Sequence, residues 1–103
     1  KFSTNSNSKL SARNIDKIAR DYLVKQGFPA IPHSLGHGIG IDVHELPHLS
    51  PHSKDIIGEG MVFSIEPGIY IENYGGVRIE DLVMVTKTAA ELISHANRDL
   101  IEL

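Results

Sequence analysis

Three side chains that could bind a metal ion stand in two glycine-rich stretches of this chain. His37 lies within HSLGHGIGIDVHE, and Glu66 and Glu80 lie within GMVFSIEPGIYIENYGGVRIED. An imidazole and two carboxylates are ordinary protein ligands for divalent cations, and carboxylate oxygens suit the harder ions. The pattern therefore predicts part of a metal site, and a metal-dependent hydrolase is the kind of function that such a site supports.

Two segments have the composition of strands: Met61–Ile65, which Glu66 directly follows, and Val77–Thr86, which contains Glu80. Because side chains alternate along a strand, each segment offers one of these carboxylates on a mixed face. Arg78 shares the face of Glu80, and a guanidinium at that position favours the ionised, ligating form of a carboxylate. We therefore expect Arg78 to support the two carboxylates.

The register of the hairpin between these segments decides whether the carboxylates meet. A turn centred near Tyr74-Gly75 predicts that Glu80 lies opposite about Ile69, three residues from Glu66. On that register only a bulge or bend at Pro67-Gly68 would bring both carboxylates to the same pair of metal ions.

Glycines surround the most interesting histidine. His37 lies between Gly36 and Gly38, so we expect backbone and solvent to approach closely and its ring to be little shielded. His44 follows seven residues later, a spacing that on an unbroken strand places it on the opposite face. Because Gly38 and Gly40 argue against an unbroken strand, access of both rings to one pocket stays open.

The remaining histidines carry weaker signals. His33, which follows a proline and precedes His37 by four residues, is an intermediate candidate for the same pocket. For His48, His52 and His95 the simplest interpretation is a surface or hydrogen-bonded histidine.

One amphipathic helix is predicted over residues 11–27. Ser11 is a suitable N-cap and Gly27 a suitable stop. The expected core-facing stripe has the spacing of one helix face and consists of Ile15, Ile18, Ala19, Tyr22 and Leu23. Asp16 and Asp21 are five residues apart and are interpreted as surface charges rather than metal ligands.

After the helix the pattern changes to short strands interrupted by glycine and proline, and Glu91–Ser94 is a candidate last strand. Residues 1–9 are rich in serine and asparagine and predict a disordered tail. The expected organisation is that tail followed by one unit over residues 10–103, with a helix packed on a mainly antiparallel, curved sheet. The predicted fold class is α+β.

Composition limits the class of protein. With 103 residues, 41% hydrophobic and 22% charged, the chain is at most one small globular domain. A net charge of −3 does not favour nucleic-acid binding. The absence of cysteine is compatible with a reducing compartment, and no apolar run approaches the ~20 residues that span a bilayer. We expect a cytoplasmic protein that binds neither membranes nor nucleic acids.

Three blocks in a fixed order carry a family resemblance: HSLGHGIGIDVHELP, GMVFSIEPGIY and GGVRIEDLVMVT. Together they resemble the pita-bread metallopeptidases, and within these the Xaa-Pro dipeptidases (prolidases) and the related aminopeptidase P. The resemblance covers about residues 10–103. It implies the C-terminal half of a pita-bread fold and hydrolysis of Xaa-Pro bonds in a dipeptide or short peptide.

The resemblance also implies roles for single residues. His37 and Glu80 would be metal ligands, and Glu66 would be both a ligand and the general base for the attacking water. His44 and His33 would contact the scissile carbonyl, and Arg78 would support the carboxylates. Two divalent ions are implied, with manganese the best match to these ligands and cobalt or zinc as alternatives.

The resemblance implies further ligands that the chain lacks. Relatives supply two aspartates from strands upstream of the GHGIG block, and only 36 residues precede His37 here. We therefore expect the chain by itself to be inactive, and an uncovered half of such a fold to self-associate, for example as a homodimer. Two other interpretations remain: a non-catalytic peptide- or protein-binding module on this fold, and a structural fragment whose polar residues only satisfy turns.

Overall fold

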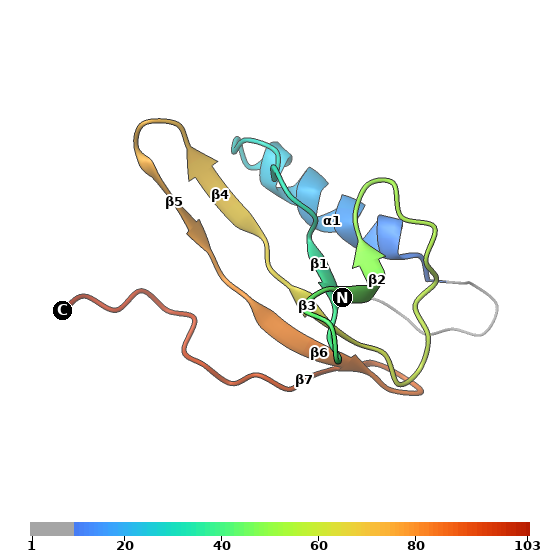
Figure 1. Ribbon diagram of the computed structural model, residues 1–103. Coiled ribbons are helices and arrows are strands. Elements are labelled where there is room, and N and C mark those ends of the chain that lie inside the picture. Colours follow the sequence, from blue (N-terminus) through green and yellow to red (C-terminus); the bar gives the residue numbers. More distant parts are fainter. Residues whose placement is uncertain (1–9) are drawn as a thin grey trace.

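The computed structural model describes residues 10–103, so the predicted tail at residues 1–9 lies outside the described residues. The described part contains one helix and seven strands: α1 (Ala12–Lys25), β1 (Gly36–Gly38), β2 (Glu45–Leu49), β3 (Val62–Ile65), β4 (Gly68–Ile71), β5 (Gly75–Arg78), β6 (Asp81–Val85) and β7 (Ala90–Leu92). Five strands form an antiparallel sheet in the order β2-β1-β3-β6-β7. Strands β4 and β5 form a two-stranded arm that extends beyond it (Figure 1). The predicted α+β class is confirmed.

The ends of the helix follow the local signals in the sequence. The side chain of Ser11 accepts a hydrogen bond from the backbone N–H of Asn14 at 3.0 Å, as an N-cap does. Just beyond the helix, Gly27 has a φ of 93°, a conformation that glycine adopts without steric cost. Both predicted boundaries are therefore confirmed to within two residues.

The buried face of α1 differs from the predicted stripe. Ala12, Ile15 and Asp16 are its buried residues, whereas Ile18 and Tyr22 are 58% and 62% exposed. The prediction was wrong for Ile18 and Tyr22 because the N-terminal half of α1 supplies the packing and an acidic residue lies on the inward face. These exposed apolar side chains are compatible with the expected self-association, which stays a prediction.

Asp16 is 0% exposed, so the prediction that it is a surface charge was wrong. Its carboxylate accepts hydrogen bonds from Arg20 Nε and Nη2 at 2.9 and 3.0 Å, and from the backbone N–H of Leu35 at 3.1 Å. Arg20 also donates to the carbonyl oxygens of Ile31 and His33. The hydrogen bonds that Arg20 donates to Asp16 raise the pKa of Arg20, so its guanidinium stays charged. This buried ion pair ties the helix to the segment that leads into β1.

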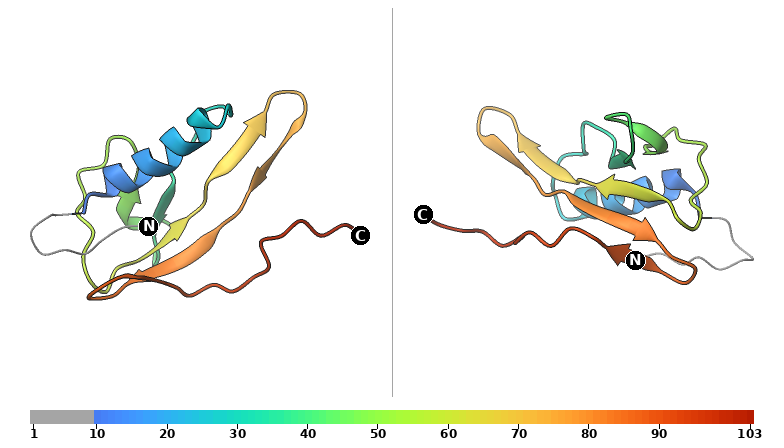
Figure 2. Two further views of the ribbon diagram at one scale, coloured as in Figure 1. Left: turned by 180° about the vertical axis from the view of Figure 1, so that it is seen from behind. Right: turned by 60° about the horizontal axis from the view of Figure 1, so that its bottom comes forward.

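The core lies between α1 and the sheet, with the helix beside β1 and β2 (Figure 2). Its buried apolar side chains come from the helix, the loops and the central strands: Ala12, Ile15, Ile31, Leu35, Leu49, Ile57, Phe63, Val83 and Val85. Within residues 10–103, no helix has both the length and the apolar character needed to cross a bilayer.

The long hairpin brings the two glutamates together without a bulge. The pairing of β3 with β6 and that of β4 with β5 share one continuous register, so Glu66 falls across from Glu80. The predicted register was wrong because the turn lies earlier, around Asn73, whose φ is 61°. Asparagine tolerates this left-handed conformation better than most residues, and the turn forms there. The predicted 77–86 strand is also divided, because β5 ends at Arg78 and β6 begins at Asp81, although the N–H of Ile79 still donates to the carbonyl oxygen of Pro67 at 3.3 Å.

Candidate metal centre

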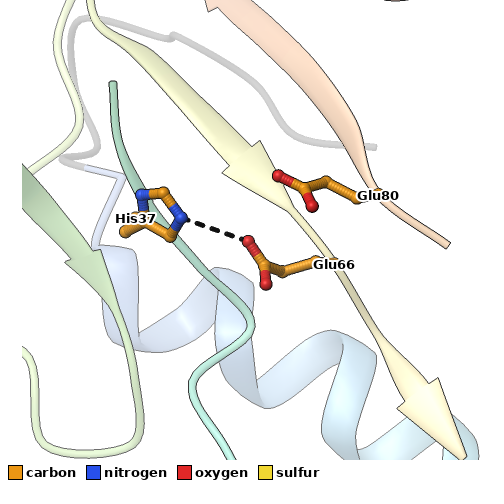
Figure 3. Close-up of side chains that lie close together, drawn as sticks. All are labelled: His37, Glu66 and Glu80. Atoms are coloured by element: carbon orange, nitrogen blue, oxygen red, sulfur yellow. Dashed lines mark ion pairs between the residues drawn. The ribbon is translucent and has the colours of Figure 1, made fainter. Parts of the chain in front are cut away.

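His37, Glu66 and Glu80 converge on one point, as Figure 3 shows. One ligand atom from each of the three lies within 4.8 Å of the others. His37 Nε2 and Glu66 Oε2 are 3.3 Å apart. These residues come from β1, from the end of β3 and from the residue before β6, so three segments far apart in the sequence build one cluster.

The hydrogen bonding of His37 suits a metal ligand. Its Nδ1 lies 2.9 Å from the carbonyl oxygen of Gly38. Because a carbonyl oxygen only accepts, Nδ1 carries the proton, and a neutral ring then presents the lone pair of Nε2 to the carboxylate of Glu66. Either a proton on Nε2 or a metal ion bound by both atoms makes this contact favourable. The donor set therefore fits a divalent cation, with both side chains largely buried at 19% and 15% exposed.

The glycines beside His37 are required by close backbone contacts. A Cβ atom on Gly36 would lie 1.8 Å from the carbonyl oxygen of Ser64, and one on Gly38 would lie 2.0 Å from that of Leu46. The expectation that backbone approaches here is therefore confirmed. The expectation that the ring is little shielded was wrong, because the strands that approach so closely also cover the imidazole.

We predict that Gly36→Ala destabilises the chain by about 1–3 kcal/mol or more, because a backbone carbonyl cannot move aside as a flexible side chain does. Gly58→Ala is the matched control, since nothing lies within 4 Å of the added Cβ. Urea unfolding of the two variants measures the difference. Equal stability of the two variants would show that β1 and β3 are further apart than described.

A cavity of about 410 Å³ opens beside the cluster, within the usual size range of ligand pockets. Five of the six predicted site residues line it, and only Glu80 does not: His33, His37, His44, Glu66 and Arg78. Ser34, Gly36 and His48 complete the lining. The ring of His44 lies edge-on to that of His37, with centroids 4.5 Å apart. The sequence left open whether His37 and His44 share a pocket, and the structure shows that both line this cavity.

His33 and Arg78 have contrasting surroundings. His33 Nδ1 donates to the carbonyl oxygen of Ser34 at 2.7 Å, so its Nε2 accepts from the hydroxyl of Tyr70 at 2.8 Å. Arg78 borders the cavity, yet within residues 10–103 no hydrogen bond or ion pair joins it to Glu66 or Glu80. Its role as support for the carboxylates stays a prediction.

His48 is the pocket residue that sequence reasoning missed. It lies on β2 directly across from His37, and its side chain borders the cavity. The pairing of β1 with β2 contains an irregularity between His37 and Gly38, so the distance along the chain does not reveal which residue faces His37.

Comparisons with known proteins agree with this geometry. Residues 5–87 match the model of metallopeptidase family M24. The Xaa-Pro dipeptidase of Pyrococcus horikoshii is 44% identical over 93 residues, which cover 89% of this chain and 26% of that protein. The structure of the Xaa-Pro dipeptidase from Bacillus anthracis matches with a TM-score of 0.88 at 42% identity, over 93% of this chain and 27% of that one.

A more distant relative of known structure is described together with its own active site. The X-prolyl aminopeptidase of Caenorhabditis elegans, described as a cytosolic enzyme with a dinuclear active site, matches with a TM-score of 0.63 at 33% identity, over 74% of this chain and 13% of that one. The chain spans about a quarter of the length of the curated relatives it matches. The sequence blocks, the pita-bread fold and the candidate metal cluster agree, and the chain belongs to metallopeptidase family M24.

Proposed function

We propose that this chain forms the downstream part of a dinuclear metal centre that hydrolyses Xaa-Pro peptide bonds. The observation that carries the proposal is the convergence of His37, Glu66 and Glu80 beside a cavity of ligand size. The Xaa-Pro dipeptidases among its relatives support the choice of bond. The substrate is then a dipeptide or short peptide with proline after the scissile bond, and the expected location is the cytoplasm.

His37, Glu66 and Glu80 would hold two divalent ions together with two aspartates that the family resemblance places upstream. The abundance of carboxylate oxygen and the single imidazole favour manganese, with cobalt or zinc as alternatives. When bound, such ions acidify a water molecule and polarise a carbonyl group.

The side chains around the cavity supply the remaining chemistry. Glu66 accepts the proton of the attacking water, which its position beside the cavity allows. His44 and His33 orient the scissile carbonyl and stabilise the charge that develops on its oxygen. For His33 this requires Nε2 to exchange the hydroxyl of Tyr70 for the substrate.

A chimera tests the proposal: residues 10–103 replace the matching part of the Pyrococcus horikoshii enzyme, whose remaining sequence supplies the upstream segment. With manganese, the chimera is expected to hydrolyse an Xaa-Pro dipeptide and to spare the same dipeptide with alanine in place of proline. The 103-residue chain alone is expected to show no hydrolysis.

Two outcomes would contradict this assignment. Hydrolysis by the chain alone would show that the upstream ligands are not needed. A folded chimera that binds the dipeptide without cleaving it would favour the peptide-binding module instead.

A further inference from the structure

Ser64 is a buried polar residue in the middle of β3 that no proposed catalytic step uses. It is 0% exposed, and it is one of two polar or charged residues that are fully buried within residues 10–103, the other being Asp16. A buried hydroxyl without partners is costly, so its hydrogen bonds show what it does.

Both hydrogen bonds of Ser64 reach proposed metal ligands. Its Oγ accepts from the backbone N–H of His37 at 3.1 Å and donates to Glu66 Oε2 at 2.7 Å. The directions follow from the chemistry, because a backbone N–H only donates and an ionised carboxylate only accepts. One hydroxyl thus links a ligand on β1 with a ligand at the end of β3.

The location of Ser64 makes this link short and rigid. Ser64 and Glu66 share a face of the strand, so the hydroxyl reaches the carboxylate directly. The carbonyl of Ser64 lies where a side chain of Gly36 would be, so β1 and its neighbour β3 approach closely at this residue. His37 Nε2 lies 3.3 Å from the same carboxylate oxygen that accepts the hydrogen bond from Ser64.

We infer that Ser64 is a positioning residue for the metal centre: its hydroxyl sets the rotation of the Glu66 carboxylate and its distance from His37. The inference rests on the proposed function. Hydrogen-bonding partners behind metal ligands orient them, and losing such a partner typically weakens metal affinity or activity about 10- to 100-fold.

Three substitutions in the chimera separate the hydroxyl from the space it fills. Ser64→Ala and Ser64→Cys are expected to weaken Mn²⁺ binding in calorimetric titration, and to lower kcat/KM, about 10- to 100-fold. Cysteine fills the space but is only a weak donor and acceptor. Ser64→Thr retains the hydroxyl and suits a strand, so it is expected to restore affinity to within about threefold of the wild type.

Val85→Ala is the control for a purely structural role. Val85 is buried at 2% exposed and lies on β6, next to β3 but outside the proposed site. It is expected to lower stability without changing the affinity for Mn²⁺. If Ser64→Ala and Ser64→Cys bind Mn²⁺ as tightly as the wild type, or if Val85→Ala weakens binding equally, the inference is overturned.

A readout that needs no metal distinguishes this failure from a failure of the proposed function. Amide hydrogen exchange of His37, measured without metal, is expected to be faster in Ser64→Ala than in the wild type or Ser64→Thr, because its acceptor is lost. If the wild-type chimera binds no Mn²⁺, the proposed function fails. The exchange rate then still shows whether the Ser64 hydroxyl holds the backbone of His37. Unchanged exchange in Ser64→Ala overturns the inference.

Discussion

Replacing Glu66 by glutamine in the chimera is expected to lower kcat for Xaa-Pro hydrolysis about 100- to 10,000-fold, the range that one general acid–base group supplies. Glutamine matches the shape of glutamate but cannot accept a proton from water. It also exchanges an anionic ligand for a neutral amide beside His37, where Glu66 Oε2 lies 3.3 Å from the imidazole. The expected result is therefore lost turnover together with weaker Mn²⁺ binding, measured by steady-state kinetics and calorimetric titration.

Glu72→Gln is the matched control, because Glu72 is exposed in the turn between β4 and β5 and away from the cavity. It removes the same charge and is expected to leave kcat within about twofold, since surface substitutions have small effects. Turnover by Glu66→Gln at the wild-type rate would remove Glu66 from the chemistry. Equal losses in both variants would point to net charge rather than to the site.

Replacing Asp16 by alanine is expected to lower the free energy of unfolding by about 3 kcal/mol, at the lower end of the range for breaking a buried ion pair. The lower end applies because the Arg20 side chain is 20% exposed and keeps some contact with water. The N–H of Leu35 loses its carboxylate acceptor but keeps the carbonyl oxygen of Leu49 at 2.8 Å, so this loss adds little. Urea unfolding followed by circular dichroism measures the loss.

The same helix supplies the control. Lys17 and Asp21 form an ion pair with the same spacing, but their side chains are 67% and 61% exposed. Asp21→Ala is therefore expected to cost less than about 1 kcal/mol. Asp16→Asn retains an oxygen acceptor and is expected to fall between the two. Equal losses in Asp16→Ala and Asp21→Ala would mean that Asp16 is solvated and that the contact with the 31–35 segment is absent.

Much of the fold and of the site was predictable because it depends on local chemistry. The N-cap at Ser11 and the stop at Gly27 act through their own backbone neighbours, so the ends of α1 were predicted correctly. His37, Glu66 and Glu80 were recognisable as candidate ligands because they lie in three ordered blocks, and the structure brings them together.

The errors arose where distant segments decide the outcome. Hydrophobic spacing selected Ile18 and Tyr22 for the core, yet Asp16 faces inward because it binds Arg20 and Leu35. An aspartate four residues before an arginine has the same pattern whether the pair is buried or exposed, so sequence cannot distinguish the two.

The sequence by itself determined the family, the types of ligand and the ends of the helix, because these follow from residue identity and short-range order. Only the tertiary structure decided that Glu66 lies across from Glu80, that His48 faces His37, and that Ser64 joins two proposed ligands. The physical reason is that strand register and the path of loops depend on contacts between residues far apart in the chain. A shift of one residue in a strand reverses which side chains face the site.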